Sequence, residues 1–354
     1  MTPYIVMLMV MALCIWLEES SNSAKTKNGV FIAALLPYII LMTFKDVSVG
    51  ADTMNYLHSF KAMSQYDFRQ FLSFDEYGYE RIEVGYKFLI WLLSRITDDG
   101  HILLLFTALI SSRAMYLFIK KNATNWSLAL FIFLTLGFFQ FAMSGIRQTI
   151  AISIVLFGYG FIRERKLIKF SLLVMIAMLF HKSAIFFFPA YFVAGMKLNR
   201  KNISLAFVST FLLYFVAGDL FLAAADLLEY DYNIESTNNG YIFFGLVFLI
   251  TVLSIMFRKR LTDTKTSNSI LITLNLISLA LWTMRLVSRT AERISLYYMP
   301  YSYLTLEQII SSRKKGEKTV WMLASIILCG YLCLRRLSHQ DEFSNFKFFF
   351  GSLL

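Results

Sequence analysis

The residues best suited to chemistry lie in one stretch, 137–183. Arg147 stands between two apolar runs, with Gln140 and Gln148 close by. Ionisable groups at membrane depth are costly, so they usually pair with another group or perform a task. A guanidinium is permanently charged, its rigid fork of donors suits phosphate, and a helix starting near Ile146 would add free amides. The stretch predicts an anion site; the alternative is an arginine that reaches lipid headgroups.

Two residues, His181 and Asp52, could act as a base. His181 and Lys182 end the next apolar run, and an imidazole can donate, accept or take a proton near neutral pH. The alternative is a helix-end histidine that satisfies a backbone carbonyl. Asp52 lies in a glycine-containing turn directly after an apolar run. It could act as a base or orient a sugar hydroxyl, whereas an Asp before Thr is also a common helix N-cap.

A second group of cations lies further along the chain. Arg285, Arg289 and Arg293 recur every four residues, which predicts one helix face, and Glu292 can offset one of them. The alternative is a solvated helix end. Three cations on a face predicted to lie outside the cell have the wrong sign for topology alone, and that favours an anion site.

The composition predicts an all-α polytopic membrane protein. The chain is 57% hydrophobic and only 16% charged, and runs long enough to cross a bilayer recur along it. A β-barrel would show alternation with a period of two. The three cysteines have no metal-ligand spacing, and no nucleotide-binding motif is found, so no cofactor is expected. The net charge of +11 fits cytoplasmic Lys and Arg better than nucleic acid.

We predict twelve membrane spans in a single integral membrane domain, 1–354. The apolar runs are 3–17, 29–44, 101–119, 126–142, 146–162, 167–180, 184–197, 204–228, 240–257, 269–287, 294–311 and 319–334. A further run, 84–96, is too short to span and should be interfacial or re-entrant. The segment 45–100 is then a loop with amphipathic pieces that forms part of the active site.

The distribution of charge predicts the orientation. Six loops hold 19 of the 34 Lys and Arg residues and are assigned to the cytoplasm: 18–28, 120–122, 163–169, 197–201, 258–265 and 313–318. Both termini, the 45–100 segment and Arg147 then lie outside. This orientation requires that 84–96 does not cross, because otherwise the first loop and Arg147 fall on opposite faces.

Five short motifs resemble those of the EpsG-type family, which are Wzy-like polymerases of bacterial exopolysaccharide and O-antigen. They are Val49-Gly-Ala-Asp-Thr53 with Tyr56, Glu83-Val-Gly-Tyr86, Gly145-Ile-Arg-Gln-Thr-Ile-Ala151, Leu179-Phe-His-Lys-Ser-Ala184 and Arg293-Ile-Ser-Leu-Tyr-Tyr298. The tail Phe346-Lys-Phe-Phe-Phe350 also fits. The departures are Ala51, where the family usually has Thr, and Val84, where Pro is frequent; neither removes a reactive group.

The resemblance implies a reaction and its partners. A glycan on undecaprenyl diphosphate would be transferred to another lipid-linked repeat unit, at the outer face of the bacterial plasma membrane. Arg147 and Arg293 would hold the diphosphate, and Asp52 or His181 would take the proton. Eight further residues are predicted to contact substrate: Gln140, Gln148, Glu83, Tyr86, Lys182, Arg285, Arg289 and Tyr297.

The resemblance also allows a helix arrangement like that of GT-C glycosyltransferases, and it makes a chain-length regulator protein an expected partner beside the bilayer. Two other functions remain open on sequence. One is another lipid-linked glycosyltransferase or ligase. The other is a transporter or flippase, which would need polar groups along a path to both faces, whereas the candidates here gather on one.

Overall fold

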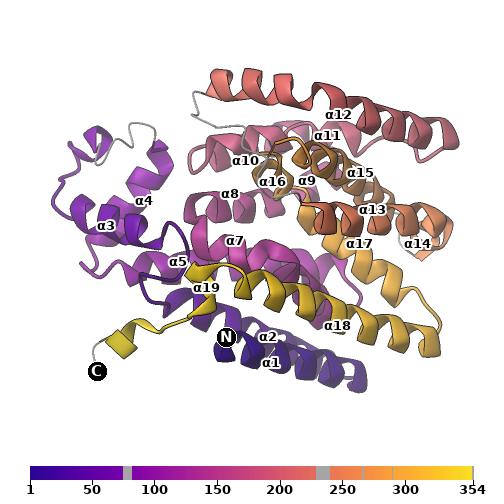
Figure 1. Cartoon of the computed structure of the whole chain (residues 1–354), viewed down its shortest axis with the longest axis horizontal. Coiled ribbons are helices and arrows are strands. Elements are labelled where there is room, and N and C mark those ends of the chain that lie inside the picture. The colour runs from indigo at the N-terminus through magenta and orange to yellow at the C-terminus, as the bar shows by residue number, and fades with distance from the viewer. Residues whose placement is uncertain (75–81, 229–239, 265–266, 289, 353–354) are drawn as a thin grey trace. The chain divides into compact units, whose positions relative to one another are not determined.

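The computed structural model describes residues 1–74, 82–228, 240–264, 267–288 and 290–352 (Figure 1). Within these residues the secondary structure is helical, apart from one isolated β-bridge between Lys45 and Phe348. The chain forms two compact units. Unit 1 comprises Met1–Phe157, Met175–Lys182 and Thr319–Leu354, and unit 2 comprises Gly158–Val174 and Ser183–Lys318. The prediction of an all-α protein is confirmed for the described part of the chain.

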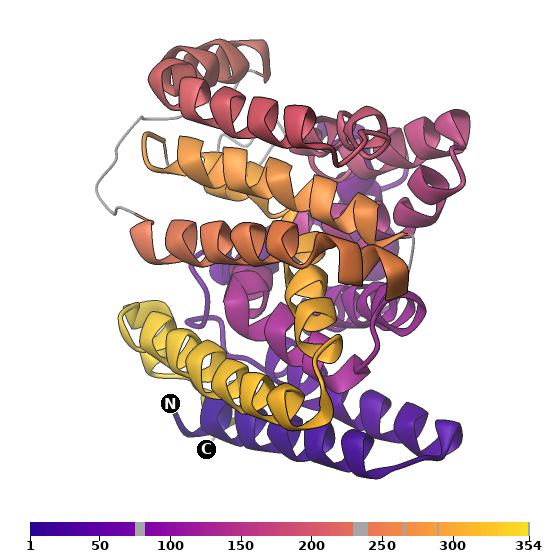
Figure 2. The ribbon, with the colours of Figure 1, turned by 90° about the vertical axis from the view of Figure 1, so that its right-hand side faces the viewer.

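Unit 1 is built from the N-terminal helices and the C-terminal segment. Its elements are α1 (Thr2–Ser20), α2 (Ala24–Thr43), α3 (Thr53–Met63), η1 (Phe71–Ser73), α4 (Val84–Ser94), α5 (His101–Asn122), α6 (Trp126–Phe133), η2 (Leu134–Phe138), α7 (Phe139–Ser144), α8 (Ile146–Phe157), most of α18 (Lys315–Ser338), α19 (Asp341–Ser344) and η4 (Phe349–Ser352). α2 packs against α1 and α5, and α5 packs against α8. α18 runs alongside α1 and α2 (Figure 2).

Several turns of unit 1 gather at one end. The Met1 ammonium donates to the Ser344 carbonyl at 3.4 Å, and the amide of Gly50 donates to that of Glu342 at 3.2 Å. The amide of Ala51 donates to Ser144 Oγ at 3.2 Å. The first loop, the tail and the break before Arg147 therefore share one end of the unit. This is the arrangement that a non-spanning 84–96 run requires.

The helices of unit 2 pack around one central helix, α15. Its elements are α9 (Tyr159–Arg163), the first part of α10 (Leu167–Met178), η3 (Lys182–Phe187), α11 (Ala190–Val193), α12 (Arg200–Leu228), α13 (Tyr241–Met256), α14 (Arg258–Thr264), α15 (Asn268–Arg285), α16 (Thr290–Ser295) and α17 (Met299–Ser311). α15 packs against α12, α13, α16 and α17.

Seven helices in the described residues are long and apolar enough to cross a membrane, rather than the twelve predicted. They are Thr2–Ser20, Ala24–Thr43, His101–Asn122, Trp126–Ser144, Ile146–Arg163, Arg200–Leu220 and Lys315–Ser338. The predicted span 184–197 shows one cause of the difference. A 3₁₀ helix and the short α11 replace one long helix there, with Pro189 between them. Proline has no N–H to donate and its ring disfavours a continuous helix.

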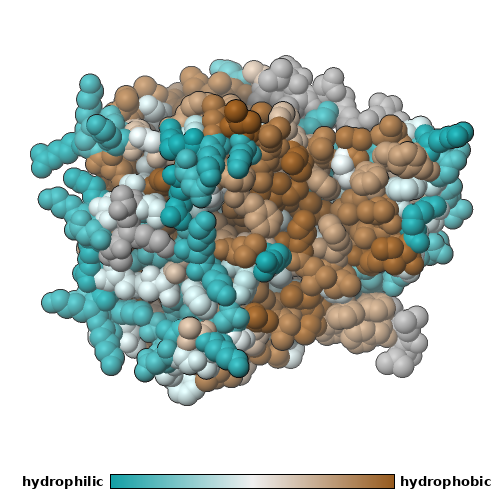
Figure 3. All heavy atoms as spheres, turned by 180° about the vertical axis from the view of Figure 1, so that it is seen from behind, coloured by the Kyte–Doolittle hydropathy of each residue, from teal (hydrophilic) through white to brown (hydrophobic). Residues whose placement is uncertain are grey.

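The surface supports a multi-pass membrane protein. Apolar side chains cover wide areas of the face seen in Figure 3. Large apolar side chains are exposed elsewhere too, among them Phe211 and Phe215 on α12 and Val320 and Ile327 on α18. Soluble monomers rarely expose contiguous apolar patches of this kind, whereas lipid tails are an apolar solvent for them.

Candidate active site

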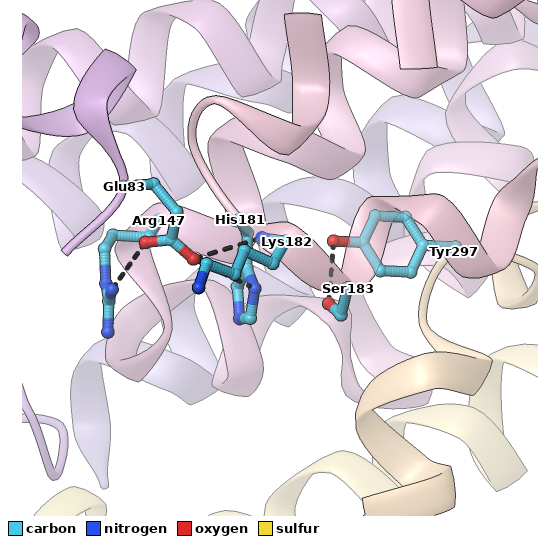
Figure 4. Close-up of polar contacts among 6 residues, drawn as sticks. All are labelled: Glu83, Arg147, His181, Lys182, Ser183 and Tyr297. Atoms are coloured by element: carbon cyan, nitrogen blue, oxygen red, sulfur yellow. Dashed lines mark hydrogen bonds and ion pairs between the residues drawn. The ribbon is translucent and has the colours of Figure 1, made fainter. Parts of the chain in front are cut away.

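A buried carboxylate joins three of the sequence-predicted residues in unit 1 (Figure 4). Glu83 Oε2 accepts from Arg147 NH1 at 2.6 Å, and Glu83 Oε1 accepts from the backbone amide of Lys182 at 3.1 Å. His181 Nδ1 lies 3.7 Å from Oε1, too long for a hydrogen bond but close enough that the carboxylate would stabilise a protonated imidazole. The Glu83 side chain is only 2% exposed. Glu83 is therefore the residue that connects the candidate cation to the candidate base.

The start of α4 fixes Glu83 in this place. The amides of Gly85 and Tyr86 both donate to the Leu179 carbonyl, at 2.8 and 3.2 Å, two residues before His181. A Cβ atom at Gly85 would come within 2.7 Å of that carbonyl oxygen, so only glycine allows the approach. The Glu83 side chain does not cap its own helix, and its carboxylate instead accepts from the first residue of η3.

The break between α7 and α8 presents Arg147. α7 ends at Ser144, and the amide of Gly145 closes it by donating to the Phe141 carbonyl at 2.7 Å. α8 begins at Ile146, so Arg147 lies in its first turn, as the sequence predicts. An arginine at the start of a helix adds its charge to the positive end of the helix dipole, which makes this turn suited to an anion.

Two tyrosines stand beside the Arg147 guanidinium. Its centre lies 6.0 Å from the centroid of the Tyr86 ring, within cation–π range, and Tyr56 is a hydrogen-bond partner. The Tyr56 and Tyr86 rings meet edge to face at 6.0 Å. Asp52 precedes Tyr56 by one helical turn, at the N-cap position of α3, and its side chain makes no capping hydrogen bond. Asp52 therefore occupies the N-cap position, as the alternative expects, but its side chain does not cap the helix.

Lys45 is a buried cation that sequence reasoning missed. Its ammonium donates to the Val49 carbonyl at 3.1 Å, to Thr53 Oγ1 at 2.5 Å and to the Met143 carbonyl. Burial lowers the pKa of Lys45 to about 7, although the negative charge of Asp52 acts in the opposite direction and raises it. Both forms of an amine donate hydrogen bonds, so Lys45 ties the Asp52 turn to the end of α7 in either state. Its sequence context, a lysine beside an aspartate after an apolar run, gives no signal of this burial.

The two glutamines predicted to bind substrate lie on different helices. Gln140, on α7, donates to Gln340 next to α19 and so links α7 to the tail. Gln148 is buried on α8, directly after Arg147. Of this pair, only Gln148 is adjacent to the arginine in the chain.

The remaining predicted residues belong to unit 2, which the chain enters between Lys182 and Ser183. Tyr297 Oη and Ser183 Oγ are hydrogen-bonded at 3.2 Å (Figure 4). Arg293 is exposed, and Arg289 lies outside the described residues. Arg285 is buried, and its Nε donates to Glu292 Oε2 at 2.8 Å.

The expectation that the three arginines follow one helix face is wrong for the described pair. α15 ends at Arg285 and a separate helix, α16, begins at Thr290. In one unbroken helix, Arg285 and Glu292 would be separated by about 10 Å along the axis. Because α16 is a separate helix, the Glu292 carboxylate can reach the buried guanidinium and supply a counter-charge.

The residues of the cluster fit acid–base and anion chemistry. No group of three or more His, Cys, Asp or Glu side chains that could hold a metal ion is found in the part of the chain that the structure describes. What the site offers is an arginine at a helix start, an imidazole, and a buried carboxylate between them.

The fold and these residues define a multi-span helical membrane protein in which Arg147 and His181 gather around the buried Glu83 in the first unit. The model of the EpsG family matches residues 28–349, and the chain belongs to this family. No curated protein and no solved structure is significantly similar to the chain.

Proposed function

We propose that this protein is a membrane glycosyltransferase that joins polyprenyl-diphosphate-linked oligosaccharide repeat units into a bacterial polysaccharide. Membership of the EpsG family is consistent with polysaccharide biosynthesis. The observation that carries the proposal furthest is the Glu83–Arg147–His181 cluster, because it pairs a phosphate-binding group with a base. The undecaprenyl carrier follows from the resemblance of the motifs.

The proposed reaction uses no cofactor. The acceptor hydroxyl oxygen attacks the anomeric carbon of the donor, and the bond from that carbon to the phosphate oxygen breaks. The hydroxyl proton passes to His181, and the polyprenyl diphosphate leaves with the bonding electrons. Arg147 stabilises the charge that grows on the leaving diphosphate. The Glu83 carboxylate stabilises the imidazolium that forms when His181 takes the proton.

The direct test uses purified protein in liposomes with a defined lipid-linked repeat unit. A polymerase should produce a ladder of lipid-linked glycans, each one repeat longer than the last. A single transfer onto a different acceptor would instead indicate a ligase. Movement of the lipid-linked unit across the bilayer without any new glycosidic bond would indicate a flippase and would refute the proposal.

The proposal includes the charge-based topology, with about twelve spans and the site facing outward. The basic loops 163–169 and 258–265 should be cytoplasmic and the 45–83 segment external. Cysteines placed singly at Ser73 and Ser267 should differ in labelling by a membrane-impermeant maleimide, with Ser73 labelled from outside. Labelling at position 267 but not at position 73 would reverse the orientation.

A further inference from the structure

We propose that one apolar face of unit 1, the α4 platform, rests in the interfacial layer of the lipid bilayer. The platform consists of the exposed side chains of Phe68, Leu72, Val84, Phe88, Leu92 and Ile96. This inference concerns how the protein contacts lipid, and it does not depend on the proposed reaction.

The α4 platform begins as a stripe along one helix. Val84, Phe88 and Leu92 are spaced four residues apart, which places them on one face of α4, and Ile96 follows two residues after the helix ends. Their exposed fractions run from 43% at Phe88 to 70% at Ile96. The opposite face of α4 is buried, through Tyr86, Leu89, Ile90 and Leu93. α4 is therefore packed against protein on one side only.

The segment before α4 widens this stripe. The Phe68 ring lies 5.3 Å from the Trp91 ring, and the Phe71 ring lies 5.9 Å from that of Phe88. Lys87 Nζ donates to the Leu72 carbonyl at 3.1 Å and holds this segment against α4.

Cationic and aromatic groups frame the platform. Arg95 NH2 donates to the Ser64 carbonyl at 2.7 Å, and its guanidinium lies 5.6 Å from the centroid of the Trp91 ring. Tryptophan is enriched where a membrane meets water, and long cationic side chains reach to that level from an apolar surface.

The length and position of α4 identify lipid as the occupant. With 11 residues, α4 is about 16 Å long, roughly half of what the ~30 Å hydrocarbon core requires. It packs against α5, which is long and apolar enough to span and begins at His101, shortly after α4 ends. A short helix with an exposed apolar face beside the start of a span lies in the plane of the interface.

This placement sets the depth of the candidate active site. Glu83 is the residue directly before α4, and its carboxylate holds Arg147 at 2.6 Å. If α4 lies in the interface, Glu83 and Arg147 lie at the level of the lipid headgroups. A diphosphate carried on a polyprenyl chain would occupy the same level. Only this last consequence rests on the proposed function.

Spin labels on the protein in liposomes test the proposal. The cysteine-free background replaces Cys14, Cys329 and Cys333, all of which are buried and unpaired by disulfides. Single cysteines at Phe88 and Leu92 carry the label, and collision rates are measured with oxygen, which partitions into lipid, and with a nickel chelate, which stays in water. Both positions should favour oxygen, at a depth within about 10 Å of the headgroup boundary.

Two reference positions calibrate the measurement. Leu109 is half exposed midway along α5 and should report deep lipid, and Lys314 lies in an exposed turn between α17 and α18 and should report water. A Lys314-like preference for nickel at Phe88 and Leu92 would overturn the proposal. So would low collision rates with both probes, since they would show that another protein surface covers the platform.

A second measurement needs no substitution on the platform. In a variant that keeps Trp91 as its only tryptophan, lipids brominated near the headgroup should quench fluorescence more than lipids brominated near the chain ends. Equal and weak quenching by both lipids would contradict an interfacial position. Neither measurement requires turnover, so a failure of the proposed reaction would leave this inference standing.

Discussion

Glu83→Gln is expected to reduce polymer formation by about 10²–10³-fold while the protein remains folded. Glutamine keeps an oxygen that can accept from the Lys182 amide, so it removes the charge rather than the shape. The loss leaves the partly buried Arg147 without the carboxylate that positions it, and misplacement of a group that orients the substrate can cost about 10²-fold in rate. Initial rates with a lipid-linked repeat unit measure the effect. Glu317→Gln, at an exposed position in the first turn of α18, is the matched control and should have no effect.

A double-mutant cycle separates positioning from general damage. Arg147→Lys keeps the charge but loses the fork that grips two phosphate oxygens, and it should be nearly as damaging as Arg147→Ala. If Glu83 acts by holding Arg147, combining Glu83→Gln with Arg147→Lys should cost much less than the sum of the single effects. Full additivity, or near-normal polymer from Arg147→Lys at unchanged protein level, would contradict this role.

The local chemistry of the site was predictable from sequence because each residue carries its own signal. Arg147 interrupts apolar runs, and His181 ends one, so each is costly unless it has a partner or a task. That Glu83 joins them was not predictable, since 64 residues separate it from Arg147 and 98 from His181. Periodicity and composition report the neighbourhood of a residue along the chain, not its tertiary partners.

The errors have similar physical causes. The arginine spacing implied one helix face, but the buried Arg285 has Glu292 as its partner, and the chain turns to make that contact. In the sequence, Lys45 resembles any lysine at the end of an apolar run, and only the fold shows that its ammonium donates to three oxygens. Hydropathy also did not show that 184–197 folds as a 3₁₀ helix and the short α11, because an apolar run does not reveal whether its backbone forms one continuous helix.

His181→Gln is expected to lower turnover by ~10²–10⁴-fold, the usual effect of removing a general base. The structure favours His181 over Asp52 for this role. His181 is buried beside the Glu83 carboxylate, whereas Asp52 precedes Tyr56 by one turn, where it can orient an acceptor hydroxyl near Arg147. A general base must be unprotonated to accept the hydroxyl proton, so wild-type turnover should fall toward acid pH. The residual turnover of His181→Gln should lack this fall.

Asp52→Asn should lower turnover less and should keep the acid fall of the wild type, because the titrating base is still present. His339→Gln and Asp263→Asn change the same residue types at exposed positions and serve as controls. The contrary argument is that glycosyl transfer commonly uses a carboxylate. If Asp52→Asn is inactive at every pH and His181→Gln turns over normally, Asp52 is the base. If both variants stay active, the proton must leave by another group, and Glu83 is then the carboxylate nearest to Arg147 that could receive it.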